Sequence, residues 1–397
     1  MSFTTTIETN GENNLISFQP TDEEQQLLET VRRFSEDVVI PDAREADVRG
    51  EIDPSIRGQY CELGLHLLGI PESLGGIGEF TLTSKLLMEE VLANASVSHA
   101  LALDSAGLGA QAIIRLGSEA QQQHCLPPVL EEPNKAVAFA VSEADLASHT
   151  GHFQTRAEKK GGGYVLNGEK LAVLNADRAE HIVVLARAES GSGFSGVKAL
   201  IVEKDNPGVT VGSRQKFMGL NAAPTFEVIF TDCEVSSEAE LCSAENIAQE
   251  IVQVLNIGRA INGARNVAVG QAALAMAVDY AQEREAFGKK ICQHQGLAFF
   301  IVDKEVALNA AQALNYKAIS RVTQGKDATQ AACLAINYSN RAAVQATIDS
   351  IQVFGGAGFM KDLNVERYMR DARTLANVLG SEAEHNEVLG EYLYPAA

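Results

Sequence analysis

The chain has 397 residues, of which 46% are hydrophobic and 21% charged, and this composition predicts a folded protein with a large core. Acidic side chains outnumber basic ones by 52 to 32, and the formal net charge of −20 argues against nucleic acid and anionic membranes as partners. The six cysteines lack C-x-x-C spacing, which indicates reduced thiols in a cytoplasmic protein. The eight histidines lack paired-ligand spacing and no apolar run approaches transmembrane length, so we expect neither a metal site nor a membrane span.

The N-terminal part of the chain predicts a tail followed by helices. Residues 1–17 are polar, and we expect a disordered tail there. Residues 18–133 predict an all-α domain, in which Thr21 and Glu24 have capping-box spacing. Apolar residues then recur at helical spacing, and Pro41 is expected to end this first helix.

Residues 134–242 change to the period of β-strands. In "YVLNGEKLAVLN", the pair Asn167-Gly168 lies between two short apolar runs and predicts a hairpin turn. The runs "HIVVLARA", "VKALIVE" and "TFEVIFTDCEV" are rich in β-branched or aromatic residues and are separated by turn residues. We expect an antiparallel, barrel-like β domain.

Residues 243–397 are helical again and rich in alanine. Long patterns such as "ARNVAVGQAALAMAVDYAQERE" predict long helices that pack closely through small side chains. We therefore expect a C-terminal four-helix bundle. The predicted fold class is α+β and multi-domain, in the order helical domain, β domain, long-helix bundle.

Several motifs occur in one order along the chain: "LGIPESLGG", "AFAVSEADLASH", "EREAFGKKICQHQ", "QVFGGAGF" and "VERYMRDAR". Taken together, they resemble the acyl-CoA dehydrogenase superfamily over nearly the whole chain after the tail. The resemblance implies FAD as cofactor and an acyl thioester as substrate, carried by CoA or by an acyl carrier protein. It also implies a homodimer or tetramer assembled through the C-terminal bundle.

The resemblance assigns one group of residues to the ADP half of FAD. Arg284 matches an arginine that reaches the flavin pyrophosphate across a subunit interface, and a guanidinium fork suits phosphate geometry. The other residues that match this half are Phe287, Gln295, Gln352, Gly355 and Gly356. Glycine at the last two positions permits close approach of the backbone to the cofactor.

A second group matches positions on the flavin-ring side: Val141, Ser142 and Ser148. Ser381 is a further residue that the resemblance assigns to FAD. The family usually places Trp and Thr against the flavin, two positions apart in one strand. This chain has Ala172 and Leu174 there, so we expect a smaller and purely apolar wall.

The catalytic base of the family is missing. Dehydrogenation requires a carboxylate that takes the α-proton of the thioester while hydride leaves the β-carbon. The usual glutamate precedes the glycine that matches Gly380, and Leu379 occupies its position. Some family members place the glutamate before an arginine that matches Arg259, and Gly258 occupies that position. By resemblance, Arg259 and the backbone of Leu379 lie near the thioester and are expected to bind substrate.

Three interpretations follow. The leading one is an acyl-CoA dehydrogenase-like FAD oxidoreductase acting on the CH–CH group of an acyl thioester. Its base would then have moved, and the candidates are Asp145, Asp371, Glu382 and Glu384. The second is a flavin-dependent monooxygenase of the same fold, which needs no α-proton base. The third is a catalytically degenerate subunit of a hetero-oligomer that contains a catalytic paralogue.

Overall fold

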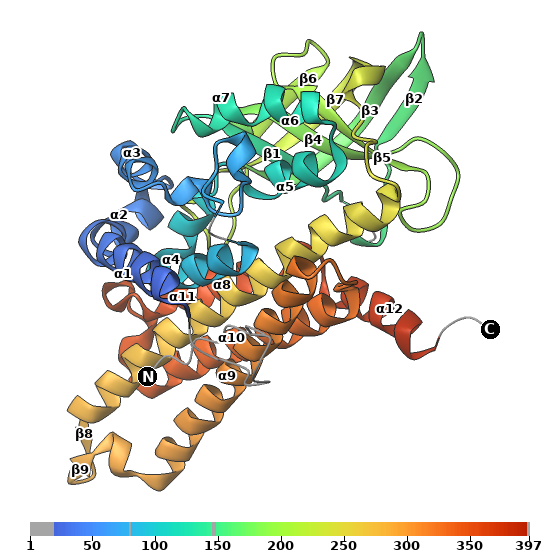
Figure 1. Cartoon of the computed structure of the whole chain (residues 1–397). Coiled ribbons are helices and arrows are strands. Elements are labelled where there is room, and N and C mark those ends of the chain that lie inside the picture. Colours follow the sequence, from blue (N-terminus) through green and yellow to red (C-terminus); the bar gives the residue numbers. More distant parts are fainter. Residues whose placement is uncertain (1–19, 79–80, 145–147, 395–397) are drawn as a thin grey trace, which may run out of the picture.

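The computed structural model describes residues 20–78, 81–144 and 148–394, so the predicted tail over residues 1–17 lies outside the described residues. The N-terminal part of the chain is helical (Figure 1). Its helices are α1 (Asp22–Phe34), α2 (Ile40–Arg49), α3 (Pro54–Glu62), α4 (Leu82–Leu103), α5 (Gly107–Leu116), α6 (Glu119–Cys125) and α7 (Pro127–Leu130).

The start of α1 is as predicted, and its end is not. Thr21 Oγ1 accepts a hydrogen bond from the backbone N–H of Glu24 at 3.2 Å, and the Glu24 carboxylate accepts one from the N–H of Thr21 at 3.1 Å. The prediction that Pro41 ends this helix is wrong, because a π-helical turn over Ser35–Val39 carries the chain into α2. Pro41 is the second residue of α2, where a missing N–H costs no intrahelical hydrogen bond.

Within the described residues, the middle part forms one seven-stranded sheet in the order β1-β4-β2-β3-β7-β6, with β5 paired to β4. The strands are β1 (Ala136–Ala140), β2 (Arg156–Lys160), β3 (Gly163–Leu174), β4 (Ala179–Arg187), β5 (Val197–Glu203), β6 (Val209–Arg214) and β7 (Thr225–Ser236). The expectation of an antiparallel domain is wrong for two strand pairs, because β1 and β2 both pair parallel with β4. The β2–β3 hairpin lies between β1 and β4 in the sequence. After this hairpin the chain crosses back to the edge of β1, and β4 therefore runs in the same direction as β1.

The hairpin turn also lies elsewhere than predicted. Asn167 and Gly168 are inside β3, where Gly168 pairs with Phe230 across an irregular register. The β2–β3 turn is made by Gly161 and Gly162, whose φ values of 59° and 88° are left-handed. Two adjacent glycines adopt such a turn without steric cost, and this outweighs the Asn-Gly signal.

The C-terminal part is a bundle of long helices. Its elements are α8 (Ile247–Glu283), the hairpin β8 (Glu285–Ala286) and β9 (Lys289–Lys290), α9 (Gln295–Thr323), α10 (Thr329–Phe354), α11 (Val365–Leu375) and α12 (Glu382–Leu393). The central helix, α8, runs from the β domain to the β8–β9 hairpin at the far end of the molecule (Figure 1). Small side chains such as Ala264 and Gly270 are buried along it and allow close packing against α10.

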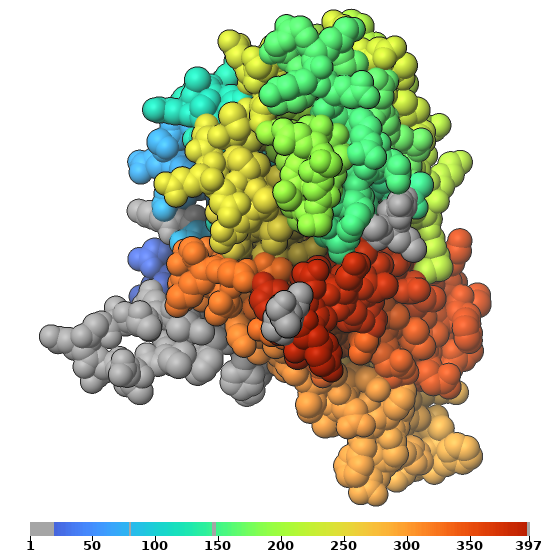
Figure 2. Space-filling view, turned by 90° about the vertical axis from the view of Figure 1, so that its right-hand side faces the viewer, coloured from blue at the N-terminus to red at the C-terminus, as the bar shows by residue number. Residues whose placement is uncertain are grey.

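The three parts are stacked so that the bundle and the β domain meet along one seam. Figure 2 shows the C-terminal segment that contains α12 lying directly below the β domain. The architecture confirms the predicted fold class. No helix in the described ranges combines the length and apolarity that a membrane span requires.

Candidate functional site

A cavity of about 490 Å³ lies where the helical part, the β domain and the bundle meet. Its wall comes from the α4–α5 junction, the end of β1, the end of β3, the segment between β6 and β7, the middle of α8 and the turn after α11. Most of the lining is apolar, and both its size and its few polar groups are typical of small-molecule sites.

The β-domain wall of the cavity contains residues that the sequence assigned to the flavin ring. Val141 and Ser142 follow β1 and line the cavity. The Ser142 carbonyl accepts a hydrogen bond from the N–H of Leu171 at 2.8 Å, which fixes this corner to β3. Lys170 is fully buried behind it and donates to the Val141 carbonyl at 3.1 Å and to Glu143 at 2.7 Å. Burial lowers the pKa of Lys170 to about 8 despite this ion pair.

The other ring-site residues differ in their placement. Ala172 and Leu174 line the cavity, so the wall that carries no Trp or Thr is part of the site. Ser148 is buried outside the lining, where its Oγ accepts from the N–H of Glu143 at 3.2 Å. Ser381, which the resemblance also assigns to FAD, lies outside it as well and caps α12.

Leu379 lines the cavity at the position predicted for the missing base. Its φ of 65° lies in the left-handed region, as does the 53° of Ala172. Such conformations cost about 1–3 kcal/mol for non-glycine residues and concentrate at functional sites. The strained backbone of the site is therefore present although its usual side chains are not.

Arg259 does not line the cavity, although the sequence predicted that it binds substrate. It is 2% exposed, and it donates to Asn256 Oδ1 at 3.0 Å and to the carbonyl of His149 at 3.3 Å. Arg259 thus holds the loop that carries His149, whose ring lines the cavity.

His149 pairs with Ser142 at the cavity wall, where its Nε2 lies 3.0 Å from Ser142 Oγ. Its Nδ1 has no hydrogen-bond partner among the described residues. Burial, followed by the positive charge of Arg259, lowers the pKa of His149 to about 3. The imidazole is therefore neutral at physiological pH, and it is a weak base.

A buried charge cluster borders the cavity and was missed in the sequence. We call Lys85, Glu89, Asp104 and Arg265 the buried charge cluster. Asp104 Oδ1 accepts from Lys85 Nζ at 3.0 Å, and its Oδ2 accepts from Arg265 Nη2 at 2.9 Å. Arg265 Nε donates to Glu89 Oε2 at 2.8 Å. Asp104 and Arg265 line the cavity.

Burial raises the pKa of Glu89, whereas the cations of the cluster keep Asp104 ionised. Burial alone would raise the pKa of Asp104, but Lys85 and Arg265 outweigh it and hold that pKa well below its ordinary value. Among the described residues that line the cavity, Asp104 is the single carboxylate, and its ion pairs leave it a poor base. Two sequence signals were available: the (i, i+4) spacing of Lys85 and Glu89, and Arg265 within an otherwise small-residue helix.

The three described candidates for a relocated base do not line this cavity. Asp371 is buried and accepts from the N–H of Leu220 at 2.6 Å, Glu382 forms an exposed ion pair with Arg341, and Glu384 caps α12. Asp145 lies outside the described residues. None of the three described carboxylates lines the cavity.

The residues that match the ADP half lie far from this cavity. We call Arg284, Phe287, Gln295, Gln352, Gly355 and Gly356 the distal set. They lie around the β8–β9 hairpin and the C-terminal end of α10, where the rings of Tyr280 and Phe354 stack with centroids 4.4 Å apart. From Asn262 at the cavity to Arg284, α8 advances about 30 Å.

The distal set is open to solvent and has the chemistry of a diphosphate site. Phe287 is 96% exposed, and Arg284 is exposed and makes no ion pair with the described residues. A Cβ on Gly355 or Gly356 would meet no atom within 4 Å, so the backbone there is accessible. One cation, two amides and bare backbone fit the ADP half of FAD.

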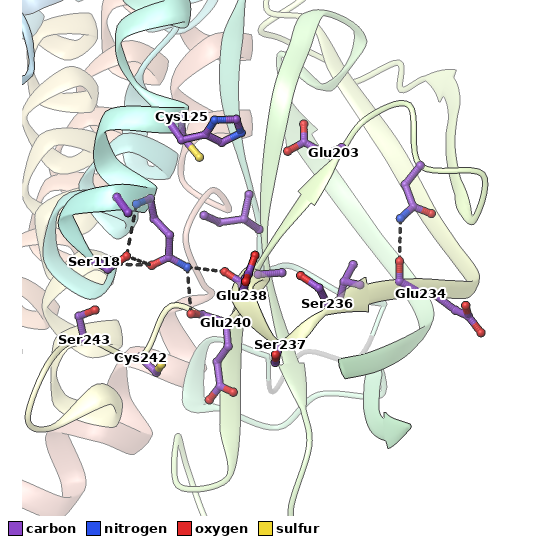
Figure 3. Close-up of a pocket in the computed structure, with 17 residues that line it drawn as sticks. Ser118, Cys125, Glu203, Glu234, Ser236, Ser237, Glu238, Glu240, Cys242 and Ser243 are labelled. Carbon is purple, nitrogen blue, oxygen red and sulfur yellow. Dashed lines mark hydrogen bonds between the residues drawn. The ribbon is translucent and has the colours of Figure 1, made fainter. Parts of the chain in front are cut away.

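A second, more open hollow of about 850 Å³ lies between α6 and the outer side of the β domain (Figure 3). Its wall is acidic, with Glu203, Glu234, Glu238 and Glu240 around it, and Gln121 bridges the carbonyls of Glu238 and Glu240. It contains none of the predicted site residues, and its charge disfavours a phosphate-bearing ligand. The described residues also contain no group of three or more His, Cys, Asp or Glu placed to hold a metal ion.

Three family models match the chain in the order of its three parts. They describe the acyl-CoA dehydrogenase N-terminal domain at residues 21–133, the middle domain at residues 138–233 and the C-terminal domain at residues 249–393. An acyl-CoA dehydrogenase of Bacillus subtilis is 32% identical over 374 residues, which cover 94% of this chain and 98% of the relative. A short-chain specific acyl-CoA dehydrogenase of Megasphaera elsdenii is 32% identical over 362 residues, which cover 90% of this chain and 94% of the relative.

A solved structure supports the same relationship. The structure of butyryl-CoA dehydrogenase from Megasphaera elsdenii superposes with a TM-score of 0.88 at 30% identity, and covers 95% of this chain and 100% of its own. Sequence, domain order and three-dimensional architecture thus agree over nearly the full length. The chain belongs to the acyl-CoA dehydrogenase family.

Proposed function

We propose that this chain is an FAD-dependent, acyl-CoA dehydrogenase-like flavoprotein that binds an acyl thioester in the cavity beside Leu379. One observation carries the proposal: Val141 and Ser142, which the sequence assigns to the flavin ring, line the same apolar cavity as Leu379. The relatives and the solved structure reported above are named dehydrogenases, and this supports a dehydrogenase over a monooxygenase of the same fold.

FAD, when bound, supplies a hydride acceptor. In this chain, Val141 and Ser142 offer backbone and hydroxyl groups to the ring, and Arg284 offers its guanidinium to the pyrophosphate. Ala172 and Leu174 leave an apolar wall whose side chains donate no hydrogen bond.

The cofactor site requires more than one subunit. The distal set lies about 30 Å along α8 from the cavity, so we infer that the ring end and the ADP end of one FAD contact two different chains. Apolar side chains exposed on the bundle supply a surface for this assembly; they are Phe287, Phe299, Val302, Val306 and Phe359. A homo-oligomer with FAD across its interface follows from the proposal.

Substrate binding does not depend on the missing carboxylate. The backbone N–H of Leu379 makes no hydrogen bond with the described residues, so it is available to a thioester carbonyl. Because Leu379 and Gly258 carry no acid or base, α-proton removal lacks its usual contribution of about 10²–10⁴-fold. We therefore infer a flavoprotein that binds thioesters and dehydrogenates them slowly. We also infer a cytoplasmic location, which the six free thiols support.

Flavin content and thioester binding test the proposal. The purified protein is expected to show an oxidised flavin spectrum, to release FAD on denaturation, and to change that spectrum on addition of an acyl-CoA. Protein that is colourless and takes up no FAD on titration would contradict the flavoprotein assignment. Flavin-loaded protein whose spectrum no acyl thioester perturbs would contradict the substrate assignment.

A further inference from the structure

The buried charge cluster places two charged side chains, Asp104 and Arg265, at one end of a largely apolar cavity. The other end opens to solvent past Phe217 and Met218, which are 38% and 51% exposed. Arg265 and the adjoining Asp104, by contrast, are almost fully buried. Arg265 lies seven residues after Gly258 on α8, so the charged end is about 10 Å along the helix from the Leu379 side.

The polar groups at this end are not saturated. Arg265 donates through Nε and Nη2, whereas its Nη1 forms no hydrogen bond with the described residues. One turn earlier on the same face of α8, Asn262 is 1% exposed and lines the cavity, and its Oδ1 also lacks a partner within the described part of the chain. A buried polar atom is costly to leave unpaired, so Asn262 Oδ1, one turn from Arg265 at the same cavity wall, points to a polar ligand group.

Charge balance defines that group further. Lys85 and Arg265 are two basic groups, and Glu89 and Asp104 are two acidic ones, so the formal charges of the cluster balance. A ligand carboxylate would add an uncompensated negative charge in a buried site. A terminal methyl group would cover Arg265 Nη1 and leave it without a partner. A hydroxyl or keto oxygen accepts from the guanidinium and adds no charge.

We propose that Arg265 and Asp104 are specificity-determining residues that select acyl thioesters bearing a neutral oxygen function on the distal part of the acyl chain. A hydroxyl group fits both residues, because it accepts from Arg265 Nη1 and donates to the Asp104 carboxylate. The inference rests on the proposed function, since it names the substrate class of the same cavity. It separates this chain from enzymes for plain fatty acyl groups, whose hydrocarbon tails need an apolar end.

Binding of a matched ligand series tests the inference on the FAD-loaded protein. The probes are CoA thioesters that differ only at the terminal group, which is methyl, hydroxyl or carboxylate, over a range of chain lengths. Dissociation constants come from calorimetry and from the flavin spectrum. At the best-fitting length, we expect the hydroxyl thioester to bind about tenfold or more tightly than the methyl and carboxylate ones.

A charge-neutral double variant assigns the preference to the cluster. Arg265→Gln with Glu89→Gln removes one charge of each sign and leaves the Lys85–Asp104 pair, and it should abolish the hydroxyl preference. The matched control is Arg115→Gln with Glu250→Gln, which removes an ion pair outside the cavity lining and should leave the preference unchanged.

Each outcome is informative. Methyl thioesters that bind as tightly as hydroxyl ones, or carboxylate ones that bind more tightly, would overturn the inference and leave the proposed function intact. A hydroxyl preference that persists in folded double variant would overturn the role of Arg265. If no thioester binds at all, the proposed function itself fails. The ligand series on the unmodified protein decides the matter even if the double variant does not fold.

Discussion

Leu379 occupies the space beside Gly258: a Cβ added to Gly258 would lie 2.7 Å from Leu379 Cδ1. By the sequence resemblance, these are the two positions that match the catalytic carboxylate of the family, and in this chain they lie against one another. A side chain of any size at position 258 therefore competes with Leu379 and with Leu108, whose Cδ1 would lie 2.6 Å from that Cβ. The loss of the base at one position is sterically linked to the residue at the other.

This contact predicts coupled stabilities. Gly258→Ala should lower the free energy of unfolding by about 1–3 kcal/mol through overpacking, despite the better helix propensity of alanine. The double variant with Leu379→Ala should lose less than the sum of the two single variants. Urea unfolding of the four proteins measures the coupling, and strictly additive effects would show that the two residues do not compete for space.

Arg284→Ala should weaken FAD retention. A hydrogen bond from a charged group is worth about 1.5–3 kcal/mol, so the dissociation constant should rise by about tenfold or more. Titration of flavin-free protein with FAD measures this. Arg341→Ala is the matched control, because it removes an exposed arginine of the same bundle that pairs with Glu382. Equal effects of the two substitutions would remove Arg284 from the cofactor site.

Val302→Lys with Val306→Lys should separate the subunits and also lower flavin content. Both side chains are exposed on α9, at 54% and 63%, one turn apart. Because the distal set of one chain is proposed to hold the cofactor of another, monomers should lose FAD. Sedimentation velocity and absorbance follow the two effects. Val48→Lys, at an 80% exposed site on α2, is the control. Monomers that keep full flavin would contradict a shared cofactor.

The neutral His149 predicts loss of stability in acid. Its pKa falls from an ordinary value of 6.5 to about 3 in the folded chain, through burial and then Arg259. The unfolded chain therefore binds the extra proton first as the pH falls. The contribution is fully present above about pH 6.5 and is lost as the pH falls toward 3. Folded His149→Gln should lose less stability than the unmodified chain between about pH 7 and pH 4. If the free energy of unfolding falls with pH equally in both proteins, the imidazole is not held neutral by burial.

The fold was predictable because each part has its own period and composition. Alanine-rich helical patterns predicted the bundle, and β-branched runs predicted the sheet. Local turn chemistry was less reliable. Asn167-Gly168 has the stronger hairpin signal, but Gly161-Gly162 made the turn because register with β7 is set by long-range pairing. The parallel pairing of β1 with β4 has no local signal at all.

The site was predictable only where a motif carried it. Val141, Ser142 and Leu379 came from matching segments, and they line one cavity. The pairing of Asp104 with Arg265 joins residues 161 positions apart and needs the fold to be seen. For Arg259 the motif matched, but the direction of the side chain could not be read from the sequence. It donates hydrogen bonds to Asn256 and to the His149 carbonyl.

Anaerobic reduction of the bound flavin by a saturated acyl-CoA is the most direct test of the central claim, a thioester-binding flavoprotein without the usual base. The unmodified protein should bind the thioester and bleach very slowly. Leu379→Glu, which restores a carboxylate at a cavity-lining position, should bleach measurably faster. Adding Ala172→Trp and Leu174→Thr should increase the rate further, because these residues complete the flavin wall. Rapid bleaching of the unmodified protein would contradict the account, and so would a folded, FAD-loaded triple variant that no acyl-CoA reduces.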